Sequence, residues 1–323
     1  MKAAIIYQRG EIPQYIENFS EPIVRNENEL IISMKAVAIK NLDKSIASGK
    51  HYSSESDYSK AIVPGGDGVG VLPDGTRVYA LGITGTLSEK ALVNKNTIVK
   101  IPVGLNDAVA SVLPNAVAGS VMALLFRAKM QKGETVLLNG ATGVTGQIGI
   151  QLAKHYGAGK IIATGRDESM RKPLLEIGAD EYILTNDKND FLEQLKEAHK
   201  KTPIDIVIDF LWGQPAEIIL NALKGKGSFQ NRTRFISVGS MAGENIQLSS
   251  SILRSVDLQI SGSGMGSWTQ EEMQKLFTEI LPETFQMAAD EKLKIETVTV
   301  NLNDIENVWN MNNEGGKRLV ILI

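Results

Sequence analysis

The sequence predicts an α/β protein in which a β-rich part accompanies a doubly wound parallel sheet. A short apolar run, Thr135–Leu138, ends in a glycine-rich turn and continues into a segment with helical apolar spacing. From Glu134 onward, apolar strands alternate with helical segments, which is typical of a doubly wound sheet. Residues 1 to 110 are instead short apolar runs divided by turn clusters such as Pro64–Gly68, which predicts a β-rich domain.

The glycine turn has the composition of a phosphate cradle. Gly140 and Gly143 remove side chains that would keep the backbone away from phosphate oxygens, and Gly146 allows the helix to pack closely on its strand. The first N–H groups of the helix, with its dipole, then face the anion. A second strand, Lys160–Thr164, completes a βαβ unit. This context predicts a dinucleotide site, and the alternative is a purely structural turn.

The residues after the second strand bear on which dinucleotide binds. An NAD site usually has an acidic residue about 20 positions after the glycines, but Arg166 stands twenty residues after Gly146. A guanidinium suits the 2′-phosphate of NADP. Asp167 is the competing signal, because a shift of one residue would bring a carboxylate to the ribose. Arg166 as a solvated residue at a helix start is the third interpretation.

Length, charge and composition limit the possible domain number, partners and metal sites. A length of 323 residues predicts about two domains, and a net charge of −3 gives no reason to expect nucleic acid or an anionic membrane as a partner. No run approaches 18 uninterrupted apolar residues, so we expect a cytoplasmic protein. There are no cysteines, and His51, His155 and His199 lack ligand spacing, so no metal site is expected.

Individual elements follow from the same patterns. An apolar helix, Val117–Met130, is expected to lead into the cofactor unit. Thr269 and Glu272 fit a capping box at the start of a helix that Pro282 bends or ends. The last strands, Lys294–Val300 and Arg318–Ile323, are expected to return to the N-terminal domain. The remaining expected strands are Ala3–Tyr7, Leu30–Ala38, Gly68–Leu72, Arg77–Ala80, Leu92–Lys100, Asp180–Leu184, Ile204–Asp209, Arg234–Val238 and Val256–Ser261.

Several of these stretches resemble one known family. They are Val136–Leu152, Ala163–Arg166, Pro64–Gly68, Asp74–Tyr79 and Gly315–Arg318. Together they resemble the zinc-independent medium-chain dehydrogenases/reductases, in the quinone oxidoreductase branch similar to zeta-crystallin. The resemblance implies a GroES-like catalytic domain from residues 1–118 and 262–323, with a Rossmann NADP-binding domain at 119–261. It also implies NADPH in a cleft between the domains and a homodimer formed through Rossmann sheet edges.

The resemblance also bears on the chemistry. Zinc-dependent members carry Gly-His-Glu where this chain has Gly65-Gly66-Asp67, and their cysteine ligands are missing here. Without a metal to stabilise an alkoxide, the expected reaction is hydride transfer from NADPH to a quinone or an α,β-unsaturated carbonyl compound. The alternatives are NADPH-dependent reduction of a simple aldehyde or ketone without zinc, and a non-catalytic NADPH-binding sensor or regulatory protein.

Two residues are candidates for catalysis. Lys40 stands where the resemblance places a cleft asparagine, and an ammonium beside the nicotinamide would stabilise an enolate or hydroquinolate. The alternative is a loop lysine that points to solvent or pairs with Asp43. Tyr52 lies in a region that lines the substrate cleft in the family, where it would donate a proton or cover the ring. A surface-loop role is the alternative.

The predicted cofactor residues extend beyond the glycines. Asn139 is expected near the nicotinamide or as a cap of the turn, and Ser240 near the nicotinamide or in an ordinary turn. Lys317 is expected at the 2′-phosphate or as a surface cation, and Trp212 as packing or as a cleft wall. The complete predicted set is Asn139, Gly140, Ala141, Thr142, Gly143, Val144, Thr145, Gly146, Arg166, Ser240 and Lys317.

Overall fold

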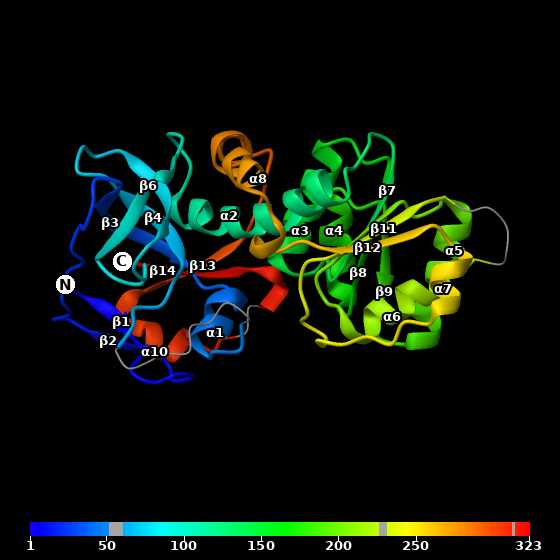
Figure 1. The fold of residues 1–323 in the computed structure, drawn as a ribbon, viewed down its shortest axis with the longest axis horizontal. Coiled ribbons are helices and arrows are strands. Elements are labelled where there is room, and N and C mark those ends of the chain that lie inside the picture. Colours follow the sequence, from blue (N-terminus) through cyan, green and yellow to red (C-terminus); the bar gives the residue numbers. More distant parts are fainter. Residues whose placement is uncertain (52–60, 226–230, 312–313) are drawn as a thin grey trace. The chain divides into compact units, whose positions relative to one another are not determined.

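The computed structural model describes residues 1–51, 61–225, 231–311 and 314–323. The chain forms two compact units: unit 1 comprises Met1–Pro114 and Phe277–Ile323, and unit 2 comprises Asn115–Leu276. Unit 1 carries a largely antiparallel six-stranded sheet, and unit 2 carries a parallel six-stranded sheet (Figure 1). The predicted α/β class, with a β-rich part and a doubly wound sheet, is therefore confirmed.

The sheet of unit 1 joins the two ends of the chain. Its strand order is β13-β14-β3-β4-β5-β6, and β3 also pairs with β6. The C-terminal strand β14 lies antiparallel to β3, with Val320 opposite Ala38. The return of the C-terminal strands to the N-terminal domain is thus confirmed. The strands of unit 1 are β1 (Ala3–Ile5), β2 (Gln14–Ile16), β3 (Glu29–Ala38), β4 (Asp67–Val71), β5 (Arg77–Gly82), β6 (Lys90–Lys100), β13 (Thr297–Asn301) and β14 (Arg318–Leu322).

A short helix, α1 (Asn41–Ala47), follows β3 directly and was not predicted. Lys40 is its N-cap, and the backbone N–H of Lys40 donates to Asp43 Oδ2 at 2.9 Å. An acidic residue at this third helical position accepts an N–H that would otherwise lack a partner, as in half of a capping box. Lys40, for which a loop position was the alternative interpretation, therefore stands at the start of a helix.

The sheet of unit 2 has the order β12-β11-β10-β7-β8-β9, and all of its strands are parallel. The order reverses around β7, so the chain fills one half of the sheet and then the other. In such sheets ligands bind outside the carboxyl ends of the strands at this switch point. The strands are β7 (Thr135–Asn139), β8 (Lys160–Gly165), β9 (Glu181–Leu184), β10 (Ile206–Asp209), β11 (Thr233–Ser237) and β12 (Leu258–Gly262).

Helices cover both faces of this parallel sheet. Neighbouring residues of β7 point to opposite faces, so Leu138 packs in one core with Ile150 and Leu174, whereas Leu137 packs in another with Leu195 and Ile219. The first core receives α3 (Val144–His155) and α4 (Arg171–Glu176), and the second receives α5 (Lys188–Lys201) and α6 (Gly213–Ala222). Both faces are thereby buried, as the run of apolar strands requires.

The helix before the cofactor unit is longer than predicted. The expected start was Val117, but α2 (Asp107–Val121) begins ten residues earlier and continues as a π-helical segment, Met122–Arg127. Pro114 lies inside α2, so a proline does not mark the helix start here. By length and composition Asp107–Arg127 would be long and apolar enough to cross a membrane, but most of its apolar window is buried in this fold. It is a core helix.

The remaining helices carry the chain back to unit 1. The predicted capping box is present, because Thr269 Oγ1 accepts from Glu272 N and Glu272 Oε2 accepts from Thr269 N. A π-helical segment, Leu276–Ile280, then precedes a helix in which Pro282 occupies the first turn. The remaining helical elements are 3-10 turns at Glu168–Met170, Met265–Ser267, Leu302–Asp304 and Glu314–Gly316, and helices α7 (Ser250–Ser255), α8 (Gln270–Lys275), α9 (Leu281–Ala289) and α10 (Ile305–Val308).

Candidate functional site

The glycine turn lies between β7 and α3, at the carboxyl edge of the unit 2 sheet. Gly140 has a φ of 86°, a left-handed conformation that favours glycine, and a Cβ atom there would meet Leu211 at 2.8 Å. The turn is fixed to the next strand, since Ala141 N donates to the Thr164 carbonyl at 2.8 Å. Gly140 is therefore required both by backbone conformation and by packing.

The start of α3 is open to a ligand. Gly143 is the N-cap and is exposed, so no side-chain oxygen of the cap satisfies the first N–H groups of the helix. A Cβ atom on Gly143 would come no closer than 3.9 Å to the described chain, where it would meet the Gly140 carbonyl. Open space in front of free N–H groups and the positive end of a helix dipole is what a phosphate needs.

Gly146 has a different role from the one predicted. A Cβ atom there would lie 2.5 Å from Ala141 Cα, so its close approach is to the turn. The glycine that comes close to the strand is Gly149, where a Cβ atom would lie 2.9 Å from the Leu138 side chain. The other predicted residues of this segment anchor it: Ala141 and Val144 are buried, the Thr142 carbonyl accepts from Gln147 and the Thr145 carbonyl accepts from Ser120.

Asn139, the last residue of β7, is fully buried and does not face solvent. Its Nδ2 donates to Asp209 Oδ1 at 2.7 Å, and its Oδ1 accepts from Thr164 Oγ1 at 2.8 Å. Thr164 Oγ1 in turn accepts from Gly140 N at 3.3 Å. The side chain therefore connects the ends of β7, β8 and β10 beneath the turn. Whether it also reaches a cofactor stays a prediction.

Arg166 directly follows β8 and is exposed at the carboxyl edge of the sheet. The competing residue, Asp167, caps the next 3-10 turn: its Oδ1 accepts from Ser169 N at 2.9 Å and from Ser169 Oγ at 2.7 Å. Because the Asp167 carboxylate already accepts these two hydrogen bonds, it would have to give them up to bind a ribose hydroxyl. The geometry thus supports the prediction for Arg166 without testing it.

The other predicted cofactor residues are more dispersed. Ser240 follows β11 at the same edge of the sheet and donates to Glu244 at 2.7 Å. Lys317 belongs to unit 1, where its ammonium pairs with Glu296 at 2.9 Å. Tyr52 lies outside the described residues. These three residues stay predictions.

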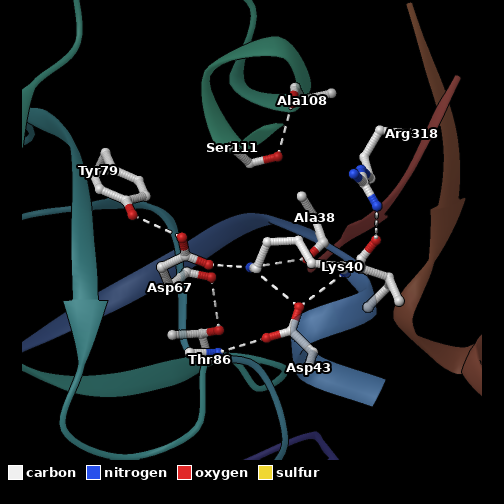
Figure 2. Close-up of polar contacts among 11 residues, drawn as sticks. Ala38, Lys40, Asp43, Asp67, Tyr79, Thr86, Ala108, Ser111 and Arg318 are labelled. Carbon is white, nitrogen blue, oxygen red and sulfur yellow. Dashed lines mark hydrogen bonds and ion pairs between the residues drawn. The ribbon is translucent and has the colours of Figure 1, made fainter. Parts of the chain in front are cut away.

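Lys40 is buried in unit 1 and is held by three oxygens (Figure 2). Its ammonium pairs closely with Asp67 Oδ1, lies 3.1 Å from Asp43 Oδ2 and donates to the Ala38 carbonyl at 3.3 Å. An ammonium has three donors, and each has an acceptor here. Lys40 does not point to solvent, and the pairing with Asp43 that the sequence left open is present.

The same cluster continues to Tyr79. The Tyr79 hydroxyl donates to Asp67 Oδ2 at 2.7 Å (Figure 2). Gly66 N donates to Asp43 Oδ1 at 3.2 Å. Burial alone would lower the pKa of Lys40, but the Asp43 and Asp67 carboxylates outweigh it and raise that pKa. Burial, together with the negative charge of Asp67, raises the pKa of Tyr79 well above its usual range. The lysine stays charged and the tyrosine stays neutral.

The sequence analysis did not identify two residues that hold these sites together: Asp67 in the Lys40 cluster and Asp209 beneath the glycine turn. Asp67 was noted only as a departure from a zinc-ligand motif, yet it joins Lys40 to Tyr79. Asp209 was noted only as the end of a strand, yet it binds Asn139 beneath the glycine turn. The sequence did contain a signal for Asp209. Asn139 and Asp209 are the polar last residues of two apolar strands, and the carboxyl ends of parallel strands lie at the same edge of a sheet.

The residues present in unit 2 fit a dinucleotide. The turn offers open space before an uncapped helix start, a cation follows the neighbouring strand, and the sheet reverses its order at this point. For a metal, the described ranges contain no group of three or more histidine, aspartate or glutamate side chains placed to hold an ion.

Known proteins are similar to this chain in sequence and in fold. A family model described as zinc-binding dehydrogenase matches residues 144–281. The quinone oxidoreductase of Homo sapiens is 26% identical over 285 residues, which cover 85% of this chain and 83% of that protein. The quinone oxidoreductase of Sus scrofa is 26% identical over 286 residues, with 85% and 84% covered.

Among solved structures, a putative NADPH:quinone reductase from Bacillus thuringiensis superposes with a TM-score of 0.83 at 18% identity, covering 100% of this chain and 98% of that one. The quinone oxidoreductase from Thermus thermophilus, also solved in complex with NADPH, gives 0.77 at 21% identity with both chains fully covered. These likenesses concern the fold. Taken with the sequence matches, they support a likeness of this chain to the quinone oxidoreductase branch of the medium-chain dehydrogenases/reductases.

Proposed function

We propose that this protein is an NADPH-dependent oxidoreductase that transfers hydride to a quinone or an α,β-unsaturated carbonyl compound without a metal. The observation that carries the proposal is the open, uncapped start of α3 behind Gly143, with Arg166 after the neighbouring strand. Relatives named quinone oxidoreductases that match 85% of the chain support the reaction class. When bound, NADPH supplies the hydride.

The residues of unit 2 bind and orient the cofactor in this proposal. The N–H groups at the start of α3 bind the pyrophosphate, and the glycines allow the backbone to approach it. The Arg166 guanidinium binds the 2′-phosphate with its planar fork of donors, which sets the preference for NADPH over NADH. Buried Asn139 holds the turn in place from below.

A conjugated acceptor is proposed because the chain offers little to stabilise a localised alkoxide. The sequence has no cysteine, and the described part of the chain brings no three ligating side chains together. Quinones and enones spread the developing negative charge over their own conjugated system. Zinc independence is part of the proposal, and it predicts that chelators leave activity unchanged.

Lys40 and Tyr52 stay predicted catalytic residues. The three acceptors around the Lys40 ammonium favour a role in holding unit 1 together. A contact with substrate would require one of these acceptors to be exchanged for a substrate oxygen. Kinetics of a Lys40 variant, described below, separate the two roles.

Two broader proposals accompany the reaction. β12 is an edge strand of the parallel sheet, so a second copy could extend the sheet there to form the expected homodimer. A cytoplasmic location is proposed as well, and a small-molecule quinone or enone is the expected partner.

The experiment that tests the proposal is consumption of NADPH, followed by absorbance, with a panel of small quinones, enones, aldehydes and ketones. We expect turnover with quinones or enones, unchanged after treatment with a chelator. Turnover limited to aldehydes or ketones would favour the simple carbonyl reductase instead. Binding of NADPH without consumption over the whole panel would leave a sensor or regulatory protein.

A further inference from the structure

The proposed reaction assigns no role to Asp209, a buried carboxylate at the switch point of the parallel sheet. Asp209 ends β10 and is fully buried, and burial raises the pKa of its carboxyl group. Its oxygens accept from three donors: Oδ1 from Asn139 Nδ2, from Leu211 N at 3.0 Å and from Trp212 N at 3.2 Å, and Oδ2 also from Trp212 N at 3.1 Å. Because two of these donors are the N–H groups of Leu211 and Trp212, the carboxylate fixes the conformation of the backbone that follows it.

The backbone that it defines is strained. Trp212 has a φ of 54° and a ψ of −155°, a conformation that a residue with a large side chain rarely adopts. Such a conformation persists only when its surroundings hold it, and here the Asp209 carboxylate binds the Trp212 N–H directly. Gly213 follows with a φ of 57° and lies against the Ala242 backbone.

The strained segment, which we call the Trp212 turn (residues 210–213), is connected to the glycine turn. The Leu211 side chain fills the space beside Gly140, where a Cβ atom would lie 2.8 Å away. A hydrogen-bond chain runs from Gly140 N through Thr164 and Asn139 to Asp209. The two turns are therefore joined by packed and hydrogen-bonded groups.

The place of the Trp212 turn in the sheet relates it to one half of the cofactor. In dinucleotide folds the strand after the glycine helix, here β8, ends at the adenosine ribose. The glycine turn itself, after β7, takes the pyrophosphate. β10 lies on the other side of β7, so a dinucleotide bound in this way would extend its nicotinamide half toward the carboxyl end of β10. This is where Asp209 and the Trp212 turn lie.

We propose that Asp209 is a positioning residue for the nicotinamide half of the cofactor, since it holds the Trp212 turn in its strained shape and ties it to the glycine turn through Asn139. This inference rests on the proposed function, because it takes NADPH as the ligand. Asp209 acts through the backbone that it orders and has no contact with the reacting atoms.

The test compares NADPH with adenosine 2′,5′-bisphosphate, which carries the adenosine and its 2′-phosphate but no nicotinamide. We expect Asp209→Ala to raise the Kd for NADPH at least tenfold and to change the Kd for the bisphosphate less than twofold. Arg166→Ala is the opposite control and should weaken both ligands. Equal losses for both ligands in Asp209→Ala, or no loss for either, would overturn the inference.

A second pair of variants keeps the test decisive if Asp209→Ala does not fold. Asn139→Asp places two carboxylates side by side and should impair NADPH binding. In the exchange variant N139D/D209N, the amide of residue 209 can again donate to a carboxylate at residue 139. We expect the exchange to recover at least part of the NADPH affinity lost in Asn139→Asp. An exchange variant that folds but binds NADPH no better than Asn139→Asp would refute the coupling. If wild-type protein bound the bisphosphate but not NADPH, or neither, the proposed function would fail instead.

Discussion

The ammonium of Lys40 and the carboxylate of Asp67 form an ion pair inside unit 1 with almost no exposure to solvent. Two charges taken out of water need every donor and acceptor satisfied, and here Asp43, Ala38 and Tyr79 complete the set. The pair joins the end of β3 to the start of β4. Its contribution to stability and its contribution to catalysis are separate quantities, and each can be measured.

Lys40→Met is expected to lower the free energy of unfolding by about 3–5 kcal/mol, because it leaves two buried carboxylates without their cation. Urea unfolding followed by fluorescence measures the change. Lys172→Met is the matched control: that lysine is exposed and lies 3.8 Å from Glu176, so little change is expected. Adding Asp67→Asn to Lys40→Met should recover part of the loss, since one unpaired charge is removed.

The same variant decides the catalytic role at a temperature where it stays folded. With all three ammonium donors already in use, we expect kcat for a quinone to change less than tenfold. A larger fall in the folded variant, about 10²-fold or more, would be the loss of electrostatic stabilisation expected for a group at the reacting atoms. That result would assign Lys40 the catalytic role that the sequence predicts.

The sequence predicted the parallel sheet well because its signals are local. The apolar strands and the glycine turn each depend on neighbouring residues, and both strands of the predicted βαβ unit are present as β7 and β8. The predicted start of the helix at Val117 was wrong, because α2 begins at Asp107 and continues through Pro114.

The candidate sites were harder to predict because their contacts are distant in sequence. Lys40 and Asp67 are 27 residues apart, and Asn139 and Asp209 are 70 apart. Which polar residues meet depends on strand order, and strand order cannot be read from spacing alone. The short helix α1 was missed for a related reason: its cap is Lys40, a residue type that does not mark a helix start.

Stability is expected to fall steeply at alkaline pH. The pKa values of Lys40 and Tyr79 are both raised in the folded protein, so above about pH 10 the folded state holds more protons than the unfolded state. Their contribution is therefore complete below that pH and is lost as the pH rises through the folded pKa values. Urea unfolding at pH 8, 10 and 11 measures the fall.

Tyr79→Phe tests the origin of this pH dependence. The variant should lose about 1–3 kcal/mol at neutral pH, because Asp67 Oδ2 loses its donor, and its alkaline fall should be shallower than that of the wild type. Tyr7→Phe, at an exposed tyrosine, should leave both quantities unchanged. An equally steep alkaline fall in Tyr79→Phe would contradict the assignment.

Gly143→Ser separates ligand binding from folding. A serine at an N-cap accepts from the first helical N–H groups, and a Cβ atom at Gly143 meets nothing closer than 3.9 Å, so stability should stay the same or rise slightly. The hydroxyl would then occupy the donors meant for the pyrophosphate. We expect the Kd for NADPH, measured by calorimetry, to rise more than tenfold.

Gly146→Ala is the companion variant. Its methyl group would lie 2.5 Å from Ala141 Cα, so the backbone must shift and stability should fall by about 1–3 kcal/mol along with affinity. Unchanged NADPH binding in a stable Gly143→Ser protein would show that the phosphate does not bind at the start of α3.

Arg166→Ala addresses the choice between the two nicotinamide cofactors. A guanidinium bound to the 2′-phosphate makes charge-assisted hydrogen bonds, so its removal should weaken NADPH about tenfold to a hundredfold. NADH has no such phosphate, and its Kd should change less than twofold. Lys172→Ala, which removes an exposed cation from the neighbouring helix α4, controls for the general loss of positive charge. Equal losses for NADPH and NADH would favour Asp167 as the residue that binds the ribose. Its carboxylate would then have to give up its hydrogen bonds from Ser169.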